Sequence, residues 1–283
     1  MSIHKSGIKR KTVTDILCQK GQEPLVCLTA YTAPMARIAD QVADLVLVGD
    51  SLGMVLYGME STVAVTLEMM VAHGRAVVLA SARALIVIDM PFGYYQEGKE
   101  QAFRSAAILM KETGASAVKL EGGAEMAETA AFLTARGIAV MGHIGLQPQS
   151  VHTSGGYRVT GHDEPEQNRI MNDAQALTKA GVFSIVLECM NPVLAQEITA
   201  RIMVPTIGIG ASSSCDGQIL VTEDMIGLSG HTVPKFVKQY ADLGRELEKA
   251  VHCYANEVRA RVFPDEDHIY TKTNPVKKLT TVS

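Results

Sequence analysis

The sequence predicts a (β/α)8 barrel, and three observations carry this prediction. Short apolar runs alternate with segments of helical period, as expected for successive βα units. Seven or eight such units fit within roughly 200 residues, which suits a closed barrel. No G-x-G-x-x-G fingerprint follows the first run, and this weakens the competing open, doubly wound sheet.

Eight apolar runs are the predicted strands. Strands of a parallel sheet are buried on both faces, so they read as nearly continuous hydrophobic segments rather than as alternating ones. The predicted strands are residues 25–31, 45–50, 84–92, 117–122, 139–145, 184–190 and 205–211, with a weaker eighth at 219–222.

Helices are predicted where a periodic segment ends at a glycine, the residue preferred just past a helix terminus. Asn191 followed by Pro192 predicts a helix start, with asparagine as the cap and proline in the first turn. The glycine-terminated segments are 99–113, 124–136 and 168–180.

The whole chain, residues 1–283, is predicted to form a single barrel domain with additional C-terminal helices. Residues 1–24 are expected to be a helical lead-in, 234–270 a charged helical extension, and 271–283 a frayed tail. Residues 146–167 show no element of their own. This segment is long for a βα loop, which favours a lid or a binding loop.

Composition excludes several functional classes. Only 20% of the residues are charged and the net charge is −4, so nucleic acid is not an expected partner. No apolar stretch is long enough for a transmembrane helix, and the basic N-terminus lacks the apolar centre of a signal peptide. The five cysteines form no C-x-x-C pair, which argues against a disulfide framework or a zinc site. We therefore expect a cytoplasmic protein that acts on small molecules.

Five of the predicted strands end on a polar residue that is useful in chemistry. In a parallel barrel the C-terminal strand ends converge at one mouth, where the active sites of such barrels lie. One acid in this position is ordinary, but five polar residues in series predict one shared cluster. The five residues are Asp50, Asp89, Glu121, His143 and Glu188.

Asp50 and Asp89 end neighbouring strands and suit an oxygen-loving cation such as Mg²⁺, which keeps its other positions for water or substrate. Glu121 ends the next strand and would act directly or through a water. The alternative is that each acid caps a helix or pairs with a basic side chain. For three acids on consecutive strand ends, the metal site is the favoured interpretation.

The remaining polar residues have two interpretations each. Lys119 shares a strand face with Glu121 and would neutralise a substrate carboxylate or enolate oxygen, or form a structural ion pair. His143 would donate to a substrate oxygen or be a satisfied core histidine. Glu188 lies across the barrel from the other acids, a position suited to a general base. Ser51 would add a hydroxyl, and residues 208–211 would be a phosphate-binding or a tightly packed turn.

The chain resembles the ketopantoate hydroxymethyltransferases over about residues 28–268. No single motif decides this resemblance, but ten motifs in the same order are specific. They are L-T-A-Y (28–31), V-G-D-S-L-G-M (48–54), D-M-P-F (89–92), V-K-L-E-G-G (118–123), G-H-I-G-L-x-P-Q-S (142–150), G-G-Y-R-V-T-G (155–161), L-E-C (187–189), I-G-I-G-A (207–211), D-G-Q-I-L-V (216–221) and P-K-F-V-K-Q-Y (234–240).

The resemblance implies a Mg²⁺-dependent barrel enzyme of pantothenate synthesis. It would transfer a one-carbon unit from 5,10-methylenetetrahydrofolate to 3-methyl-2-oxobutanoate, giving 2-dehydropantoate through a Mg-stabilised enolate. The resemblance also implies a large homo-oligomer, commonly a decamer.

The resemblance assigns roles position by position. Asp50, Asp89 and Glu121 match the metal site. Asp50, Ser51, Asp89 and Lys119 match the contacts to the 2-oxo acid. Glu188 matches the proton acceptor, and His143 matches the active-site histidine.

Five positions depart from the family pattern. The departures are Thr32, Val63, Ala64, Ser212 and Glu223, which leave the folate pocket and some loop geometry open.

The sequence has two rival interpretations. One rival is a Mg²⁺-dependent carbon–carbon lyase of the isocitrate lyase and phosphoenolpyruvate mutase group, but the K-C-G-H loop of isocitrate lyases is absent. The other is a non-catalytic paralogue that binds a 2-oxo acid.

Overall fold

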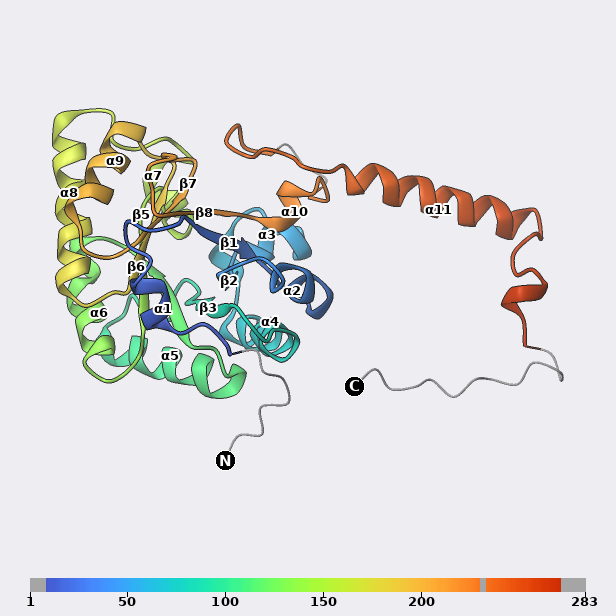
Figure 1. Ribbon diagram of the computed structural model, residues 1–283, viewed down its shortest axis with the longest axis horizontal. Coiled ribbons are helices and arrows are strands. Elements are labelled where there is room, and N and C mark those ends of the chain that lie inside the picture. The colour runs from blue at the N-terminus through green and yellow to red at the C-terminus, as the bar shows by residue number, and fades with distance from the viewer. Residues whose placement is uncertain (1–8, 230–232, 271–283) are drawn as a thin grey trace.

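A computed structural model describes residues 9–229 and 233–270, and it confirms the predicted barrel. Eight parallel strands close on themselves in chain order, with β8 paired to β1 (Figure 1). The strands are β1 (Leu25–Thr29), β2 (Leu45–Val48), β3 (Leu85–Asp89), β4 (Ala117–Glu121), β5 (Val140–Gly145), β6 (Ser184–Glu188), β7 (Thr206–Ile209) and β8 (Gly217–Leu220).

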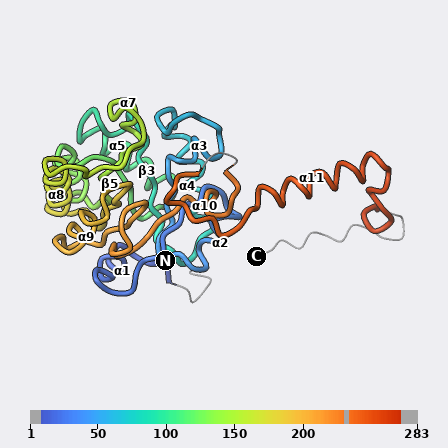
Figure 2. The backbone as a smooth tube through the Cα atoms, turned by 90° about the horizontal axis from the view of Figure 1, so that it is seen from above, coloured from blue at the N-terminus to red at the C-terminus, as the bar shows by residue number. Residues whose placement is uncertain are grey.

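Helices surround the barrel, as the tube view shows (Figure 2). The α-helices are α1 (Val13–Leu17), α2 (Ala33–Ala39), α3 (Leu52–Tyr57), α4 (Leu67–Ala80), α5 (Lys99–Thr113), α6 (Ala127–Thr134), α7 (Val151–Ser154), α8 (Glu164–Lys179), α9 (Pro192–Arg201), α10 (Thr222–Met225) and α11 (Leu243–Arg259). Short 3-10 turns are η1 (Thr62–Ala64), η2 (Ala124–Met126), η3 (Pro148–Ser150) and η4 (Glu266–His268).

Two apolar clusters form the core, and together they explain why the strand sequences lack alternation. One cluster fills the barrel interior with inward-facing side chains such as Leu45, Val87 and Ile207. The other lies between the strands and the surrounding helices and includes Val46, Ile88 and Leu109. Because each central strand contributes to both clusters, nearly all of its residues are buried.

Local capping explains several element boundaries. The Asn191 side chain accepts hydrogen bonds from the amides of Val193 and Leu194, so the predicted start of α9 is confirmed. Helix α5 matches its predicted range and ends at Gly114, which adopts the left-handed conformation. Strand β8 ends earlier than predicted, because the Thr222 hydroxyl donates to the Thr29 carbonyl and the chain turns into α10.

The absence of structure predicted for residues 146–167 was wrong. This segment contains η3, the short helix α7 and the first turn of α8. Helix α8 starts at Glu164 rather than at residue 168, because Asp163 caps it and Pro165 occupies the first turn. The segment is rich in Gly and polar residues, so η3 and α7 left no periodic apolar pattern in the sequence.

The two ends of the described chain differ in how they pack. Helix α1 lies within the predicted lead-in and buries Ile16 against the barrel interior. Helix α11 lies within the predicted extension and projects away from the barrel, as both views show (Figures 1 and 2). The predicted frayed tail, 271–283, lies outside the described residues. Over residues 9–229 and 233–270, no helix is both long and apolar enough to cross a membrane.

Candidate active site

All seven residues predicted for the site line one cavity at the C-terminal mouth of the barrel, with a volume of about 570 Å³. Five of them lie at a strand end or up to three residues after one, and Lys119 and His143 lie within the C-terminal parts of β4 and β5, so all face the end of the barrel where active sites of such barrels lie. The seven are Asp50, Ser51, Asp89, Lys119, Glu121, His143 and Glu188. The roles assigned to them in the sequence analysis stay predictions.

Asp50 and Asp89 are neighbours on the β2 and β3 ends. The backbone amide of Asp50 donates to Asp89 Oδ2 over 3.0 Å, and Asp89 Oδ1 lies 2.6 Å from Lys119 Nζ. Gly49 makes this close approach feasible. A Cβ there would come within 2.7 Å of Ser51 Oγ and 3.5 Å of Asp89 Oδ2. Ser51 Oγ is itself held at 2.7 Å from the hydroxyl of Tyr31.

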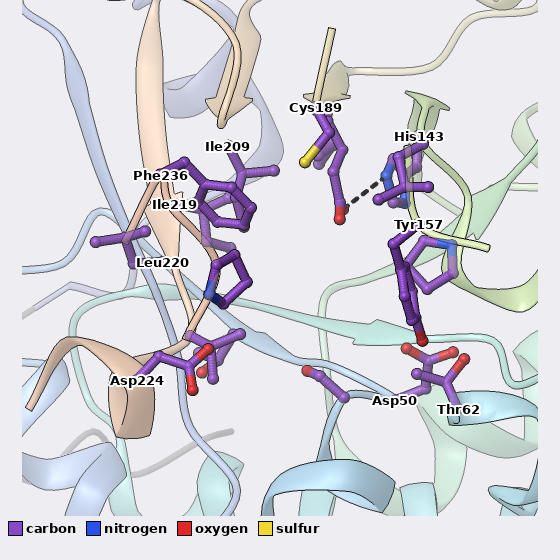
Figure 3. Close-up of a pocket in the computed structure, with 18 of the residues that line it drawn as sticks. Asp50, Thr62, His143, Tyr157, Cys189, Ile209, Ile219, Leu220, Asp224 and Phe236 are labelled. Carbon is purple, nitrogen blue, oxygen red and sulfur yellow. Dashed lines mark ion pairs between the residues drawn. The ribbon is translucent and has the colours of Figure 1, made fainter. Parts of the chain in front are cut away.

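His143 links the acids on opposite sides of the site. Its Nδ1 lies 3.5 Å from Glu121 Oε1, and its Nε2 lies 3.1 Å from Glu188 Oε2, the contact dashed in Figure 3. Strand pairing sets this arrangement, because His143 is in register with Glu121 on β4. His143 therefore lies within the polar cluster, and its role toward a substrate oxygen stays a prediction.

Burial and neighbouring charges perturb the whole cluster. Burial and Lys119 oppose protonation of His143, but the hydrogen-bonded carboxylates of Glu121 and Glu188 outweigh them and raise its pKa to about 9. Burial likewise opposes the charged form of Lys119, yet Asp89, Glu121 and Asp50 raise its pKa. Both shifts favour the protonated forms of His143 and Lys119, whose Nδ1 and Nζ atoms lie 3.4 Å apart.

The pKa values of the two aspartates are raised as well, which for an acid favours the neutral, protonated form. Burial, Asp89 and Glu121 raise the pKa of Asp50 well above its usual range. Burial also raises the pKa of Asp89, with Lys119 acting against it. Two buried carboxylates that repel each other are a setting that a cation would relieve.

The chemistry of this donor set fits a Mg²⁺ ion held by Asp50 and Asp89. The cluster holds four carboxyl groups against two basic side chains, so a divalent ion would favour the ionised forms of Asp50 and Asp89. Mg²⁺ is commonly bound through one or two carboxylates and retains several waters. Among the described residues, no group of three or more His, Cys, Asp or Glu side chains is arranged to hold a metal.

Gln149 and Tyr95 are site residues that the sequence analysis did not single out. Gln149 Nε2 donates to Asp50 Oδ2 over 2.8 Å, and its backbone amide donates to Glu121 Oε2 over 3.0 Å. Its Oε1 accepts from the Tyr95 hydroxyl over 2.6 Å. The signal available was the position of Gln149 in the G-H-I-G-L-x-P-Q-S motif directly after β5.

The cavity has a polar and an apolar side. Figure 3 shows His143 and Tyr157 on one side and, across the cavity, apolar side chains from the end of β7, from β8 and from the segment after α10. The apolar side is formed by Ile209, Ile219, Leu220 and Phe236, with Asp224 at its edge.

The turn at 208–211 serves packing. Gly210 has a φ of +59°, and a Cβ there would lie 2.8 Å from a ring carbon of Phe236. The tightly packed turn is thus the interpretation that the structure supports. None of the five departures from the family pattern lies among the residues that line the cavity.

Sequence comparison identifies close relatives over almost the full chain. The family model for ketopantoate hydroxymethyltransferase matches residues 10–266. A 3-methyl-2-oxobutanoate hydroxymethyltransferase from Paramagnetospirillum magneticum is 60% identical over 263 residues, covering 93% of this chain and 96% of the relative. The enzyme of the same name from Paracoccus denitrificans is 59% identical, covering 92% of this chain and 95% of the relative.

Structural comparison finds the same barrel in more distant proteins. Phosphonopyruvate hydrolase, solved in complex with oxalate and Mg²⁺, aligns with a TM-score of 0.58 at 13% identity and covers 93% of both chains. The 2,3-dimethylmalate lyase, a PEP mutase/isocitrate lyase superfamily member, aligns with a TM-score of 0.56 at 14% identity and covers 92% of both chains. At these identities the likeness shows the fold alone. Sequence, by contrast, shows that the chain belongs to the ketopantoate hydroxymethyltransferase family and is an enzyme of that type.

Proposed function

We propose that this enzyme transfers a hydroxymethyl group from 5,10-methylenetetrahydrofolate to 3-methyl-2-oxobutanoate, giving 2-dehydropantoate. The observation that carries the proposal is the convergence of Asp50, Asp89, Lys119 and Glu188 in one cavity of a chain of this family. Such a set binds a 2-oxo acid at one end and offers a base at the other.

Asp50 and Asp89 would hold Mg²⁺, with Glu121 reaching it through water. When bound, the ion supplies Lewis acidity to the 2-oxo group of the substrate. Phosphonopyruvate hydrolase, which shares the fold, was solved in complex with oxalate and Mg²⁺.

Lys119 and Ser51 would bind the substrate's oxygen atoms. Lys119 is buried and cationic, so it offers an ammonium where negative charge develops on the carboxylate and the 2-oxo oxygen. The Ser51 hydroxyl, oriented by Tyr31, offers a further donor.

Glu188 would accept the proton from C3, and His143 would position it. His143 Nε2 lies 3.1 Å from Glu188 Oε2, a contact that would hold the carboxylate at the polar end of the cavity. Loss of the proton leaves an enolate whose oxygen faces Lys119. The new bond forms between C3 and the donor carbon, both carbon–nitrogen bonds of the donor break, and water supplies the hydroxyl group. The C3 proton and the second proton of the water end on the two donor nitrogens.

Proton exchange tests this proposal before any folate is added. Proton NMR of 3-methyl-2-oxobutanoate in D₂O with enzyme and Mg²⁺ should show loss of the C3 proton signal. Replacing Glu188 by Gln should slow this exchange by about 10²–10⁴-fold while the acid still binds. Glu197→Gln, on the exposed face of α9, is the matched control. Wild-type exchange in the Glu188 variant would remove Glu188 from the role.

We also propose that the enzyme is a homo-oligomer, with the decamer implied by the family as the expected size. Helix α11 has no buried residue and presents one apolar face at helical spacing. A contiguous apolar face of this kind marks an interaction surface. The face comprises Leu243, Leu247, Val251, Tyr254 and Val258.

Native mass spectrometry of the wild type and of Leu247→Glu tests this proposal. The variant should release smaller assemblies, and an unchanged assembly would contradict a role for this face.

We also propose a cytoplasmic location, because the five cysteines are all free thiols, as expected in a reducing compartment.

A further inference from the structure

The cavity has a second half that the proposed chemistry at the strand ends does not use. Its volume is about 570 Å³, and pockets of about 300–1,000 Å³ typically hold drug-sized ligands. A small branched 2-oxo acid, held by Lys119 and the aspartates, occupies only the polar end. The space that remains lies along β7 and β8, on the left of Figure 3.

The far side of the cavity is an apolar wall, formed by Ile209, Ile219, Leu220 and Phe236. Phe236 is fixed in place because its ring packs directly on Gly210, where a Cβ would come within 2.8 Å of the ring. A pre-formed aromatic and aliphatic surface of this kind binds flat heterocycles, since burial of their faces removes apolar area from water.

The apolar wall lies next to the proposed base. Ile209 is in register with Glu188 across the β6–β7 pair, and the amide of Cys189 donates to the Ile209 carbonyl over 2.9 Å. A ring bound on this wall therefore lies beside the carbon from which Glu188 takes the proton. The reacting carbon of a one-carbon donor needs this position.

A carboxylate borders the wall and suits a ring edge that carries N–H groups. Asp224 is 7% exposed and lines the cavity, and the Ser229 hydroxyl donates to its Oδ1. An ionised carboxylate has about four acceptor sites, so it can accept from a ligand as well. The aminopyrimidinone edge of a pterin presents such donors.

The mouth of the cavity carries basic side chains. Arg158 and Lys235 both line it. The Arg158 side chain is 67% exposed and lies 3.7 Å from Glu166 Oε1, a contact long enough for a ligand carboxylate to share the guanidinium. The polar end inside is rich in carboxylates, so an anionic group on a ligand is directed outward to these two cations.

We propose that the apolar wall is the pterin subsite of the one-carbon donor, with Asp224 accepting from the pterin N–H edge. Arg158 and Lys235 pair with the carboxylates of the donor's glutamate tail. This inference rests on the proposed function, and it adds the residues that select a tetrahydrofolate over a free one-carbon donor such as formaldehyde.

Isothermal titration of the full-length enzyme with tetrahydrofolate, in the presence of Mg²⁺ and 2-oxo acid, tests the subsite. Phe236→Ala should raise the dissociation constant roughly tenfold, as expected for loss of one buried aromatic contact. The constant for 3-methyl-2-oxobutanoate should change far less. Phe132→Ala, which removes an aromatic ring from α6 outside the cavity, is the matched control. Phe236→Leu keeps apolar volume on Gly210 and serves if the alanine variant does not fold.

A pterin that lacks the glutamate tail distinguishes the contacts to the pterin ring from the contacts to the tail. Lys235→Gln should weaken binding of tetrahydrofolate but not of 6-methyltetrahydropterin, whereas Asp224→Asn should weaken both. Equal tetrahydrofolate affinity in the wild type and both Phe236 variants would overturn the subsite. Failure of the wild type to use 5,10-methylenetetrahydrofolate, with C3 exchange intact, would instead overturn the proposed donor and the subsite with it.

Discussion

Gln149 is predicted to be the side chain that joins the mouth loop to the carboxylate cluster, and Gln149→Leu tests this directly. Its amide is 4% exposed and makes four side-chain hydrogen bonds, two donated and two accepted. Leucine has a similar volume and removes all four. The substitution therefore tests the loss of these hydrogen bonds separately from a loss of packing.

The expected cost follows from the partners that lose Gln149. A buried group left unsatisfied costs about 1–3 kcal/mol, with charged groups at the upper end. Asp50 Oδ2 and the Met90 carbonyl each lose a donor. The Tyr95 hydroxyl loses the acceptor of its O–H, although it still accepts from the Glu121 amide. We expect a loss of about 3–5 kcal/mol in the free energy of unfolding, a large part of a typical 5–15 kcal/mol.

Urea unfolding at a fixed protein concentration measures this loss. The midpoint should fall with little change in slope, because the surface exposed on unfolding is nearly the same. Mg²⁺ affinity should fall as well, since Asp50 loses the donor that orients it. Gln147→Leu, in the same loop but with only a 3.5 Å contact to Ser150, is the control. A loss below about 1 kcal/mol with unchanged Mg²⁺ affinity would refute the reasoning.

Three further predictions follow from individual contacts. Gly49→Ala should displace Ser51 Oγ, because the new Cβ would lie 2.7 Å from it. We expect 2-oxo acid binding to weaken by about one hydrogen bond, or 1 kcal/mol. Gly98→Ala is the control, and equal Kd values for the wild type and both variants would contradict the prediction. Burial raises the pKa of Glu223 from 4.5 to about 7, and its Oε2 has no hydrogen-bond partner within the described residues, so the wild type should lose stability as pH rises between these values. Glu223→Gln should therefore gain about 1–3 kcal/mol relative to the wild type between pH 5 and pH 8 in urea unfolding, and a constant difference would exclude the effect. Burial opposes ionisation of Asp216, but hydrogen bonds from Thr206, Lys20 and Gly21 lower its pKa, so its contribution is present above pH 3.8 and is lost as pH falls further. Asp216→Asn should destabilise by about 2–3 kcal/mol at pH 7 and by less at pH 3; thermal unfolding at the two pH values compares them.

The barrel and the residues at its mouth were predictable from the sequence, because both depend on local pattern. Continuous apolar runs specify buried parallel strands, and a polar residue at a strand end is carried to the mouth wherever the barrel closes. Asp50, Asp89, Glu121, His143 and Glu188 therefore meet as predicted. Helix α5 matched its range because its terminal glycine is a local signal.

Contacts between distant segments were decided only by the tertiary structure. Gln149 reaches Asp50 across 99 positions of sequence, and no local pattern marks the hydrogen bond between them. Phe236 joins the cavity only because the chain returns over Gly210. The His143 pKa depends on two carboxylates from different strands, so its shift arises only once β4, β5 and β6 lie side by side. Local propensity places a residue on an element, whereas its charge state and its partners follow from what the closed barrel packs around it.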